Sequence, residues 1–472
     1  MKLSTLCVLS KSEIKKIHEA SIDILEQCGV KILNERMLSL LQEKGLDVNL
    51  DSQIVRFTRS CIEDSLSTIP QQFEVYNREG DFAFVLGDGN SKIAAGHNAV
   101  FWVDSETGKT RPSTVADVEL SARICEELEH IDVLGIPVMP QDVPDPKASL
   151  LYGVKACIEN CRKPVFFSSY TAKETRYCID LLKAVFVGDI KTQAYGICQI
   201  SPTSPLFWEG PVIDTILETV DTGVPIAVLP EPIAGISAPY TLAGLLTMNN
   251  AECLAGLIMI QMLRPGTKVM YANSWTTADM RTGAALVGST ETTLCRIAGA
   301  QLARFYNVPS HTTAPNSDNH AHDEQNAWEK SFSLFCSVAA GNDLIVNCGM
   351  FATGMTFSHE QLIMDDEMSA ISQRIKAGIK VNQQTIAKDL MKEIGPQGET
   401  YLTADHTLNW LGSNEYIEPK ISVTGPFASW EANGAKDTYK LARQKTIQYA
   451  ELKTKALSSN IKAKLAEIIA SF

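Results

Sequence analysis

Residues that could do chemistry follow the apolar runs of the sequence. They comprise two carboxylates, several neutral amides and hydroxyls, and large rings: Tyr170, Gln199, Ser201, Glu231, Asn273, Trp275, Asn316, Asp318 and Phe351, the last preceded by Gly349. No cysteine lies near a histidine at a spacing typical of metal ligands, so the sequence does not predict a zinc site. What this set can supply is charge, hydrogen bonding and apolar contact.

The densest polar cluster covers residues 316–324 and contains two histidines, His320 and His322. Its structural interpretation is a helix N-terminus, with Ser317 or Asp318 as the cap and two acidic residues in the first turn. In extended backbone the two histidines point to opposite sides, so at most one of them faces a pocket. His320 is our candidate for a catalytic role, and the capping interpretation is compatible with it.

Several of the other candidates also have a structural interpretation. An isolated aromatic residue in a large protein is more often part of the core than a ligand contact, which applies to Trp208, Trp275 and Phe351. Their number near predicted strand ends favours a binding role. Cys157 and Cys161 share one helix face, but no histidine is nearby, so we interpret them as packing residues.

The elements that must position these residues alternate between apolar β-rich runs and long helices over about 115–350. Near-continuous apolar strands are typical of a parallel sheet that is covered on both faces. The predicted strands are residues 133–138, 165–169, 194–199, 226–229, 268–273, 310–313 and 344–348. Six to eight such units favour a barrel over a doubly wound sheet, and a barrel has its active site at the carboxyl ends of its strands. No glycine-rich nucleotide motif follows the first strand.

Three regions are expected along the chain. Residues 1–114 form an N-terminal cap of helices and a small antiparallel sheet, opened by a capping box at Ser10 and Glu13. Residues 115–360 form the α/β barrel. Residues 361–472 are charged and helical, and we interpret them as an extension that packs on the barrel.

The composition excludes some classes of function. The chain has 472 residues, of which 45% are hydrophobic and 21% charged, as in a globular protein with a large core. Its net charge of −13 argues against a nucleic-acid or anionic-membrane partner, because both reward clustered positive charge. The first 25 residues show no signal-peptide pattern, and the 12 cysteines show no paired spacing. We therefore expect a cytoplasmic protein.

Several specific segments resemble the trimethylamine methyltransferase family, in particular its branch without pyrrolysine, which includes glycine betaine and proline betaine corrinoid methyltransferases. The matching segments extend over nearly the whole chain: residues 204–206, 223–225, 234–244, 250–256, 264–266, 279–283, 301–306, 364–367, 395–396 and 406–407. The resemblance implies a (β/α)8 TIM-type barrel. It also implies methyl transfer from a methylated amine to the Co(I) of a corrinoid, or cobalamin, carried by a cognate corrinoid protein. This chain itself would bind no metal and would form a homo-oligomer.

One departure from the family bears on the substrate. The amine-demethylating founders of the family carry pyrrolysine near the position of residues 316–322, where this chain has ordinary residues. A tertiary amine must be activated before it gives up a methyl group, whereas a quaternary ammonium already carries the charge that lets a neutral amine leave. The resemblance therefore favours proline betaine or glycine betaine over trimethylamine. Carnitine, butyrobetaine and choline remain alternatives with the same chemistry, and a non-catalytic quaternary-amine-binding protein is an alternative of another class.

A quaternary amine needs particular side chains. Aromatic faces attract a permanent cation by about 0.5 to 2 kcal/mol per contact, and a carboxylate needs donors such as His97, Asn98, Asn273 or His320. Phe101 and Trp102 are neighbours on one strand, so only one of them should contact the ligand. Glu231 would complement the ammonium electrostatically, unless it is a loop carboxylate bonded to backbone amides or to Arg281. The full set of substrate-binding candidates is His97, Phe101, Trp102, Tyr170, Gln199, Trp208, Asn273, Trp275 and Phe351.

Overall fold

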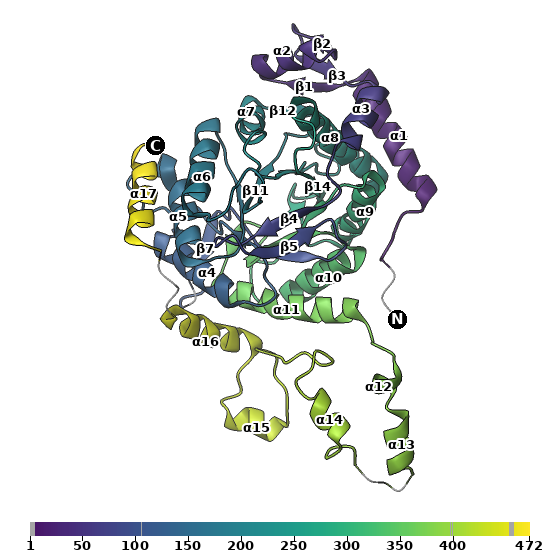
Figure 1. Cartoon of the computed structure of the whole chain (residues 1–472), viewed down its shortest axis with the longest axis vertical. Helices are drawn as coiled ribbons and strands as arrows, with labels where there is room; N and C mark the ends of the chain where they lie inside the picture. The colour runs from purple at the N-terminus through teal and green to yellow at the C-terminus, as the bar shows by residue number, and fades with distance from the viewer. Residues whose placement is uncertain (1–4, 105, 397, 399, 453–456) are drawn as a thin grey trace.

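A closed barrel of eight parallel strands forms the centre of the computed structural model, which describes residues 5–104, 106–396, 398, 400–452 and 457–472 (Figure 1). A parallel bridge between Ala94 and Val133 joins the first strand to the last. Around the barrel the order is β6 (Lys92–Ala95), β18 (Leu344–Cys348), β17 (Ser310–Thr313), β14 (Val269–Asn273), β13 (Ile226–Val228), β11 (Gly196–Ile200), β10 (Val165–Ser168) and β9 (Leu134–Gly135). The predicted (β/α)8 barrel is confirmed. Its first strand, β6, lies before residue 115, within the stretch expected to form the cap.

One helix follows each barrel strand. Most of these helices begin at a Thr, Ser or Asp whose side chain accepts a hydrogen bond from a first-turn N–H. Each of these helices therefore starts at the end of the loop that leads out of its strand, and these loops lie together at one end of the barrel. The helices are α4 (Val115–Glu127), α5 (Ser149–Asn160), α6 (Ala172–Val185), α7 (Gly210–Thr219), α8 (Leu242–Leu263), α9 (Thr290–Tyr306), α10 (Glu324–Ala340) and α11 (His359–Ala377).

Helix α8 is long and apolar, with 22 residues. Among the described helices it alone has the length and composition to cross a membrane, but 78% of its most apolar stretch is buried inside the protein. It contacts α1, α3 and α9 as well as two barrel strands. These contacts are those of a core helix.

The opposite, N-terminal end of the barrel is plugged by a hairpin of β4 (Phe73–Tyr76) and β5 (Phe82–Leu86), which faces the viewer in Figure 1. Phe73, Val75, Phe84 and Leu86 of this hairpin pack with inward-pointing barrel side chains such as Phe166. This end is therefore closed by apolar packing, which leaves the carboxyl ends of the strands as the open end.

The remaining N-terminal elements pack on the flank of the barrel. Helix α1 (Lys11–Gln27) starts at the predicted capping box, and α1 and α3 (Arg59–Ser67) contact α8. A four-stranded sheet adds a strand from the barrel region, in the order β12 (Phe207–Trp208), β1 (Val30–Ile32), β3 (Ile54–Arg56) and β2 (Asp47–Asn49), with α2 (Glu35–Glu43) beside it.

Short strands also lie in the loops at the carboxyl ends of the barrel strands. One sheet has the order β19 (Met350–Phe351), β20 (Thr356–Phe357), β7 (Phe101–Val103) and β8 (Thr110–Arg111). A separate hairpin consists of β15 (Thr277–Ala278) and β16 (Ala285–Leu286), and a 3-10 turn covers Pro146–Ala148. The strands belong to the loops that follow β6, β14 and β18, and the 3-10 turn belongs to the loop that follows β9.

The C-terminal region has a packed part and a projecting part. Helix α16 (Thr438–Glu451) packs on α11 and α4, and α17 (Ser459–Ala470) packs on α6 and α5. Between α11 and α16, Figure 1 shows four short helices that hang away from the barrel: α12 (Gln383–Ile386), α13 (Lys388–Ile394), α14 (Asp405–Trp410) and α15 (Phe427–Ala432). Only part of the predicted extension therefore packs on the barrel.

Candidate active site

A cavity of about 690 Å³ opens at the carboxyl ends of the barrel strands. Its walls come from the last residues of barrel strands, from the loops that follow β6, β10, β11, β13, β14, β17 and β18, and from the first turns of α7. This is the place where barrel enzymes carry their chemistry. Its polar lining residues are His97, Asn98, Ser168, Ser169, Tyr170, Gln199, Ser201, Glu209, Thr215, Glu231, Ser274, Thr276, Thr313, Asn316, Asn347 and Thr353.

One side of the cavity is acidic, and we call Tyr170, Ser201, Glu209 and Glu231 the acidic arc. The Ser201 hydroxyl donates to Glu231 at 3.4 Å, and the Thr203 hydroxyl donates to Glu209 at 2.9 Å. The position of Glu231 in the hollow raises the pKa of its carboxyl, and the Ser201 hydrogen bond opposes that rise. The side chain is nevertheless open to water from the cavity, so the rise is smaller than it would be in an enclosed site.

The other side is neutral and rich in amides, and we call His97, Asn98, Asn316 and Asn347 the amide arc. Asn347 Nδ2 donates to Asn316 Oδ1 at 2.9 Å, and Asn316 Nδ2 donates to the Thr313 carbonyl at 3.1 Å. Each NH2 group has a second hydrogen to offer. Asn98 bonds Ser168 Oγ at 2.7 Å, and because a hydroxyl can donate or accept, the Asn98 amide can turn either end toward the cavity.

His97 is a neutral member of the amide arc. Burial lowers its pKa to about 4, so the imidazole carries no charge at neutral pH. Its Nδ1 has no hydrogen-bond partner among the described residues, and its ring lies edge-on to Phe166 at 4.9 Å. A neutral imidazole with a free nitrogen can donate to a ligand carboxylate or accept from a ligand hydroxyl.

A buried ion pair lies behind the amide arc. Lys330 and Asp365 are fully buried and 3.0 Å apart. Lys330 Nζ also donates to the carbonyls of Pro315, at 3.2 Å, and Met350, while Gly349 N donates to Asp365 Oδ2 at 2.6 Å. Burial raises the pKa of Asp365, and the Lys330 ammonium opposes that rise. The pair therefore joins the loop after β17, which carries Asn316, to the residues that directly follow β18, the strand that carries Asn347.

The two arcs lie on opposite sides of the barrel. Tyr170, Ser201 and Glu231 follow β10, β11 and β13, which are consecutive in the sheet order, and Glu209 lies on the same connection as Ser201. The amide arc belongs to β6, β18 and β17, which are also consecutive. Among the described residues that line the cavity there is no lysine or arginine. The cavity thus has an anionic side and a neutral hydrogen-bonding side.

Exposed apolar side chains lie on loops that follow barrel strands, at the same end of the barrel as the cavity, and two of them, Tyr170 and Met355, line the cavity. We call this set the apolar rim: Val100, Phe101, Tyr170, Ile236, Tyr240, Met280 and Met355. Backbone hydrogen bonds hold parts of this rim together, since Val100 N and Phe101 N both donate to the Met355 carbonyl at 2.9 Å. Asp318 links the loop after β14 to the loop after β18, because its carboxylate accepts hydrogen bonds from Val287 N and Gly288 N and from the Thr353 hydroxyl.

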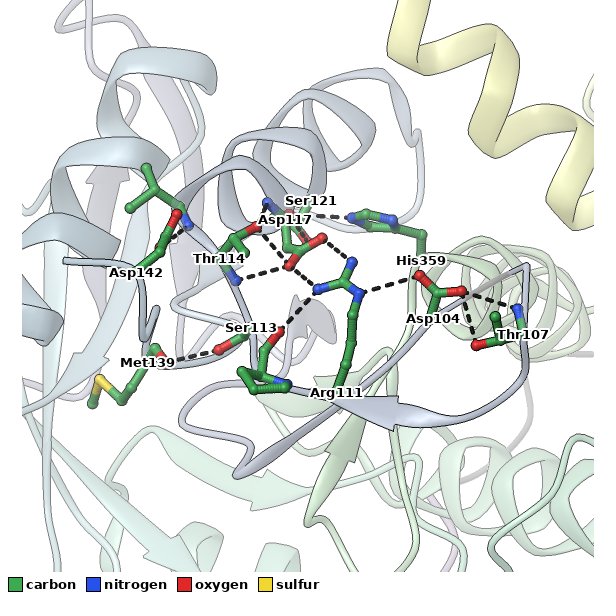
Figure 2. A network of polar contacts seen from close by, with 12 residues as sticks. Asp104, Thr107, Arg111, Ser113, Thr114, Asp117, Ser121, Met139, Asp142 and His359 are labelled. Atoms are coloured by element: carbon green, nitrogen blue, oxygen red, sulfur yellow. Dashed lines mark hydrogen bonds and ion pairs between the residues drawn. The ribbon is translucent and has the colours of Figure 1, made fainter.

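A polar network fastens the β7–β8 hairpin beside this rim, as Figure 2 shows. Arg111 donates to both oxygens of Asp117 at 2.7 Å and to Asp104 at 3.1 Å, and these carboxylates raise the pKa of the guanidinium. Asp117 also closes the capping box of α4 with Thr114. His359 Nε2 donates to the Asp117 carbonyl at 3.2 Å, which ties α11 to the same point.

Seven of the residues singled out in the sequence line the cavity: His97, Asn98, Tyr170, Gln199, Ser201, Glu231 and Asn316. Gln199 lies deep in it and accepts from His311 Nε2 at 3.3 Å. Among the described residues, Glu231 accepts from the Ser201 hydroxyl and from no backbone amide, and the Arg281 guanidinium binds Asp279 instead. Its side chain is therefore free to face a ligand.

The other predicted residues are not brought to the cavity, although they were proposed as ligand contacts. Trp102, Trp208, Asn273, Trp275 and Phe351 are buried. Trp102 is enclosed by Phe357, His359 and Arg111, and Trp208 packs against Gly256 of α8. Phe101 points away from Trp102 to the rim, and His320 is exposed on its loop. The buried rings therefore serve packing, and among the described residues that line the cavity Tyr170 is the one phenylalanine, tyrosine or tryptophan.

Some lining residues were overlooked or undervalued in the sequence. Asn347 lies inside an apolar strand, where a bulge between Val346 and Cys348 and a φ of 141° turn its side chain to the cavity. In the sequence, the one sign of this role was that Asn347 is the single amide residue in the otherwise apolar run of residues 344–348. Glu209 lies at the start of α7, in a segment with no strand-end signature.

No group of three or more His, Cys, Asp or Glu side chains that could hold a metal ion occurs in the part of the chain that the structure describes. The cavity lining itself offers one histidine and two glutamates, placed on different arcs. What the site provides is charge complementarity and hydrogen bonding.

Comparison with known proteins relates the whole chain to one family. The family model described as trimethylamine methyltransferase (MTTB) matches residues 1–471. The chain is 29% identical to trimethylamine methyltransferase MttB of Desulfitobacterium hafniense over 467 residues, covering 98% of this chain and 93% of that protein. It is 28% identical to a glycine betaine methyltransferase of the same species over 470 residues, covering 98% and 96%.

A solved structure shares the fold. The monomethylamine methyltransferase MtmB of Methanosarcina barkeri superposes with a TM-score of 0.56 at 14% identity, covering 95% of this chain and 90% of that one. At this identity the likeness concerns the barrel and its surrounding helices.

Proposed function

This chain belongs to the trimethylamine methyltransferase family, and on that premise we propose that it moves a methyl group from a betaine to the reduced cobalt of a corrinoid carried by a partner protein. Proline betaine and glycine betaine are the proposed substrates, and the demethylated tertiary amine is the product. The observation that carries the proposal is the division of the cavity into an acidic arc and an amide arc.

A betaine has the same division, with a permanent cation at one end and a carboxylate at the other. The acidic arc can attract the ammonium through Glu231 and Glu209 without a directional bond. The amide arc can donate to the carboxylate through the side chains of Asn98, Asn316 and Asn347 and through neutral His97. A substrate lying across the barrel would therefore be held at both ends.

The residues of this chain position and desolvate the substrate. When presented by its carrier, a reduced corrinoid supplies the nucleophile that takes the methyl group. The N–CH3 bond breaks and its electron pair stays on nitrogen, so the leaving tertiary amine needs no proton and no general acid at that moment. Glu231 can then work ionised. Because the positive charge on nitrogen fades as the methyl group leaves, Glu231 contributes to substrate binding rather than to the transfer step.

The apolar rim is the proposed landing surface for the partner. It lies at the end of the barrel where the cavity opens, and it presents Tyr170, Tyr240 and Met280 among its exposed side chains. A flat macrocycle held by another protein has large apolar faces, which fits a rim of this kind better than it fits a charged one. All 12 cysteines are free thiols, which is compatible with a reducing, cytoplasmic setting for such chemistry.

Trimethylamine is not a proposed substrate. The stretch 316–322 contains ordinary residues. Of these, Asn316 contributes its side-chain amide to the cavity and Asp318 links two loops. If the nitrogen of a tertiary amine is neither protonated nor otherwise activated, the group that leaves on demethylation is a dialkylamide anion, which is chemically unfavourable. A quaternary ammonium avoids this difficulty.

The test is an incubation of the purified chain with chemically reduced cobalamin and a panel of methylated amines. We expect methylcobalamin with proline betaine or glycine betaine and none with trimethylamine. Carnitine, butyrobetaine and choline in the same panel separate the alternatives within the quaternary amines. Tight betaine binding without methyl loss, even when the cognate corrinoid protein is added, would indicate a non-catalytic binding protein instead.

A further inference from the structure

A single charged side chain lies within the long apolar helix α8. Of its 22 residues, Glu252 is the one that carries a charge. The side chain is fully buried, and no lysine or arginine in the described part of the chain forms an ion pair with it. A buried carboxylate without a cation is unfavourable unless hydrogen bonds satisfy its oxygens. The donors that satisfy Glu252 therefore show what it holds.

Both oxygens of Glu252 bond to one short loop. The Leu206 N–H donates to Oε1 and the Ser204 hydroxyl donates to Oε2, each at 2.7 Å. Burial raises the pKa of Glu252 to about 7, and these two hydrogen bonds oppose that rise. A protonated Glu252 can still accept from Leu206 with one oxygen and donate to Ser204 with the other, because a hydroxyl both donates and accepts. The loop is therefore held in either protonation state.

The loop that Glu252 holds is a tight turn, which we call the 203–207 loop. It is closed by two backbone hydrogen bonds between Thr203 and Phe207, which are 2.9 and 3.1 Å long. At its tip, Leu206 has a φ of 52°, in the left-handed region that a bulky residue adopts only where its surroundings enforce it. The hydrogen bond from its N–H to Glu252 contributes to that constraint.

The 203–207 loop lies between two members of the acidic arc. Ser201 precedes the loop by two residues and Glu209 follows it by two, and both line the cavity. The Thr203 hydroxyl donates to the Glu209 carboxylate at 2.9 Å, so the base of the loop also contacts this side chain directly. The side chains of the arc have few other contacts. Their placement therefore depends on the loop, and the tip of the loop depends on Glu252.

The face of α8 that carries Glu252 approaches the same connection at a second point. Gly256 lies one helical turn further along α8, on the same face. A Cβ atom at Gly256 would come within 2.5 Å of the Trp208 ring, so a larger residue would push α8 away from β12. Two positions on one face of α8 thus fit the segment between β11 and α7.

We propose that Glu252 is a positioning residue for methyl transfer: by holding the tip of the 203–207 loop, it keeps Ser201 and Glu209 in place at the ammonium end of the substrate. This inference rests on the proposed function, which assigns that end of the cavity to a cation. Glu252 is not among the residues that line the cavity, so its effect on the substrate passes through the loop.

Glu252→Met tests the proposal, because methionine has a similar length and removes both hydrogen bonds. We expect the Leu206 amide hydrogen to exchange about tenfold faster in the folded protein, as measured by mass spectrometry of peptides that contain it. KM for a betaine should rise about tenfold with kcat little changed, because Glu209 contributes to binding rather than to the transfer step. Glu252→Gln should behave as the wild type, since its amide can accept from Leu206 and donate to Ser204.

The matched control is Gln261→Met on the same helix. Gln261 is also buried, and its amide bonds Gly266 N at 2.8 Å and the Thr267 carbonyl at 2.9 Å, in the connection from α8 to β14 at the opposite end of the barrel. This variant also loses its bonds to a loop, but it should leave the Leu206 exchange rate and KM unchanged. An equal rise of KM in Gln261→Met would mean that any weakening of α8 affects the cavity, and would overturn the proposal.

Ser204→Ala keeps the test decisive if Glu252→Met folds poorly. It removes one of the two hydrogen bonds from the loop side, and KM should rise by a smaller factor; an unchanged KM would then count against the proposal. Unchanged Leu206 exchange in folded Glu252→Met, or faster exchange with unchanged KM, would overturn it, as would a Glu252→Gln variant that behaves like Glu252→Met. A failure of the proposed function would appear differently, as a wild type that forms no methylcobalamin from any quaternary amine. The exchange measurement needs no substrate and still decides whether Glu252 holds the loop.

Discussion

The acidic arc and the amide arc of the cavity differ in how their side chains are held. Glu231 is open to the cavity and has one side-chain hydrogen bond, at 3.4 Å. Asn316 is buried, bonded to Asn347 and Thr313, and backed by the fully buried pair of Lys330 and Asp365. The attraction of a carboxylate for a permanent cation falls off slowly with distance, whereas hydrogen bonds to a carboxylate need fixed donors. The amide arc, whose hydrogen bonds are directional, is therefore held in a fixed geometry by buried contacts. The acidic arc, whose attraction is not directional, is held by few contacts.

The largest expected effect comes from breaking the buried ion pair. Lys330→Met leaves Asp365 as a buried carboxylate without its cation, which should lower the free energy of unfolding by about 3 to 5 kcal/mol. Chemical denaturation measures this change, and replacing Asp365 by Leu in the same variant should recover a large part of the loss. Arg176→Ala breaks an exposed pair with Glu218 and serves as the control, with an expected cost below about 1 kcal/mol.

If Lys330→Met is as stable as the wild type, the ion pair does not support the amide arc. The comparison between an arc held by buried contacts and an arc held by few contacts would then lose its physical basis.

On the other arc, Glu231→Gln keeps the shape of the side chain and removes its charge. We expect kcat/KM for a betaine to fall by about 100-fold, which corresponds to about 2.7 kcal/mol of lost attraction for the ammonium. The loss should appear in KM, with kcat and the melting temperature little changed. Glu218→Gln removes an equal charge outside the cavity and should behave as the wild type. A variant that melts early while its folded fraction keeps full activity would assign Glu231 to the scaffold.

A smaller and more selective effect is expected from Asn316→Asp, which adds a charge to the amide arc without changing its size. Repulsion of the betaine carboxylate should lower kcat/KM for glycine betaine by about tenfold or more, since two like charges near 4 Å repel by about 1 to 4 kcal/mol. Any turnover of choline, which lacks the carboxylate, should not fall. An equal loss for both substrates would mean that this arc does not bind the carboxylate.

The smallest effect concerns pH. Because its place in the hollow raises the pKa of Glu231, this carboxylate takes up a proton at a higher pH than an exposed glutamate does. Betaine binding should therefore weaken as the pH falls through that raised pKa, and Glu231→Gln should remove this dependence. The free energy of unfolding depends on pH in the opposite direction. A carboxyl whose pKa is raised in the folded state stabilises the fold at low pH, and this stabilisation is lost as the pH rises. Titration calorimetry across the acidic range measures the binding effect.

Much of the barrel could be predicted from sequence because its strands are continuous apolar runs. The strand β6 escaped prediction because Lys92–Ala95 is short and follows a polar turn, and only its pairing with β18 makes it part of the barrel. The C-terminal region was expected to pack, since helical charge patterns do not reveal whether a helix finds a partner within its own chain.

The sequence pointed to cavity-lining residues where a polar residue comes shortly after a strand, as for Tyr170 and Glu231. It did not reveal the amide arc as a unit, because Asn347 owes its orientation to a bulge that depends on register. The aromatic candidates show a different limit. The type of a residue does not say on which side of a strand it lies, and Trp102 and Trp275 went to the core.

The most direct test of the central claim is the structure of this chain with proline betaine bound. The account predicts that the ligand lies across the open end of the barrel, with its ammonium toward Glu231 and its carboxylate within hydrogen-bonding distance of Asn316, Asn347 or Asn98. A betaine bound in the reverse direction, with its carboxylate at the acidic arc, or bound outside the cavity, would contradict it.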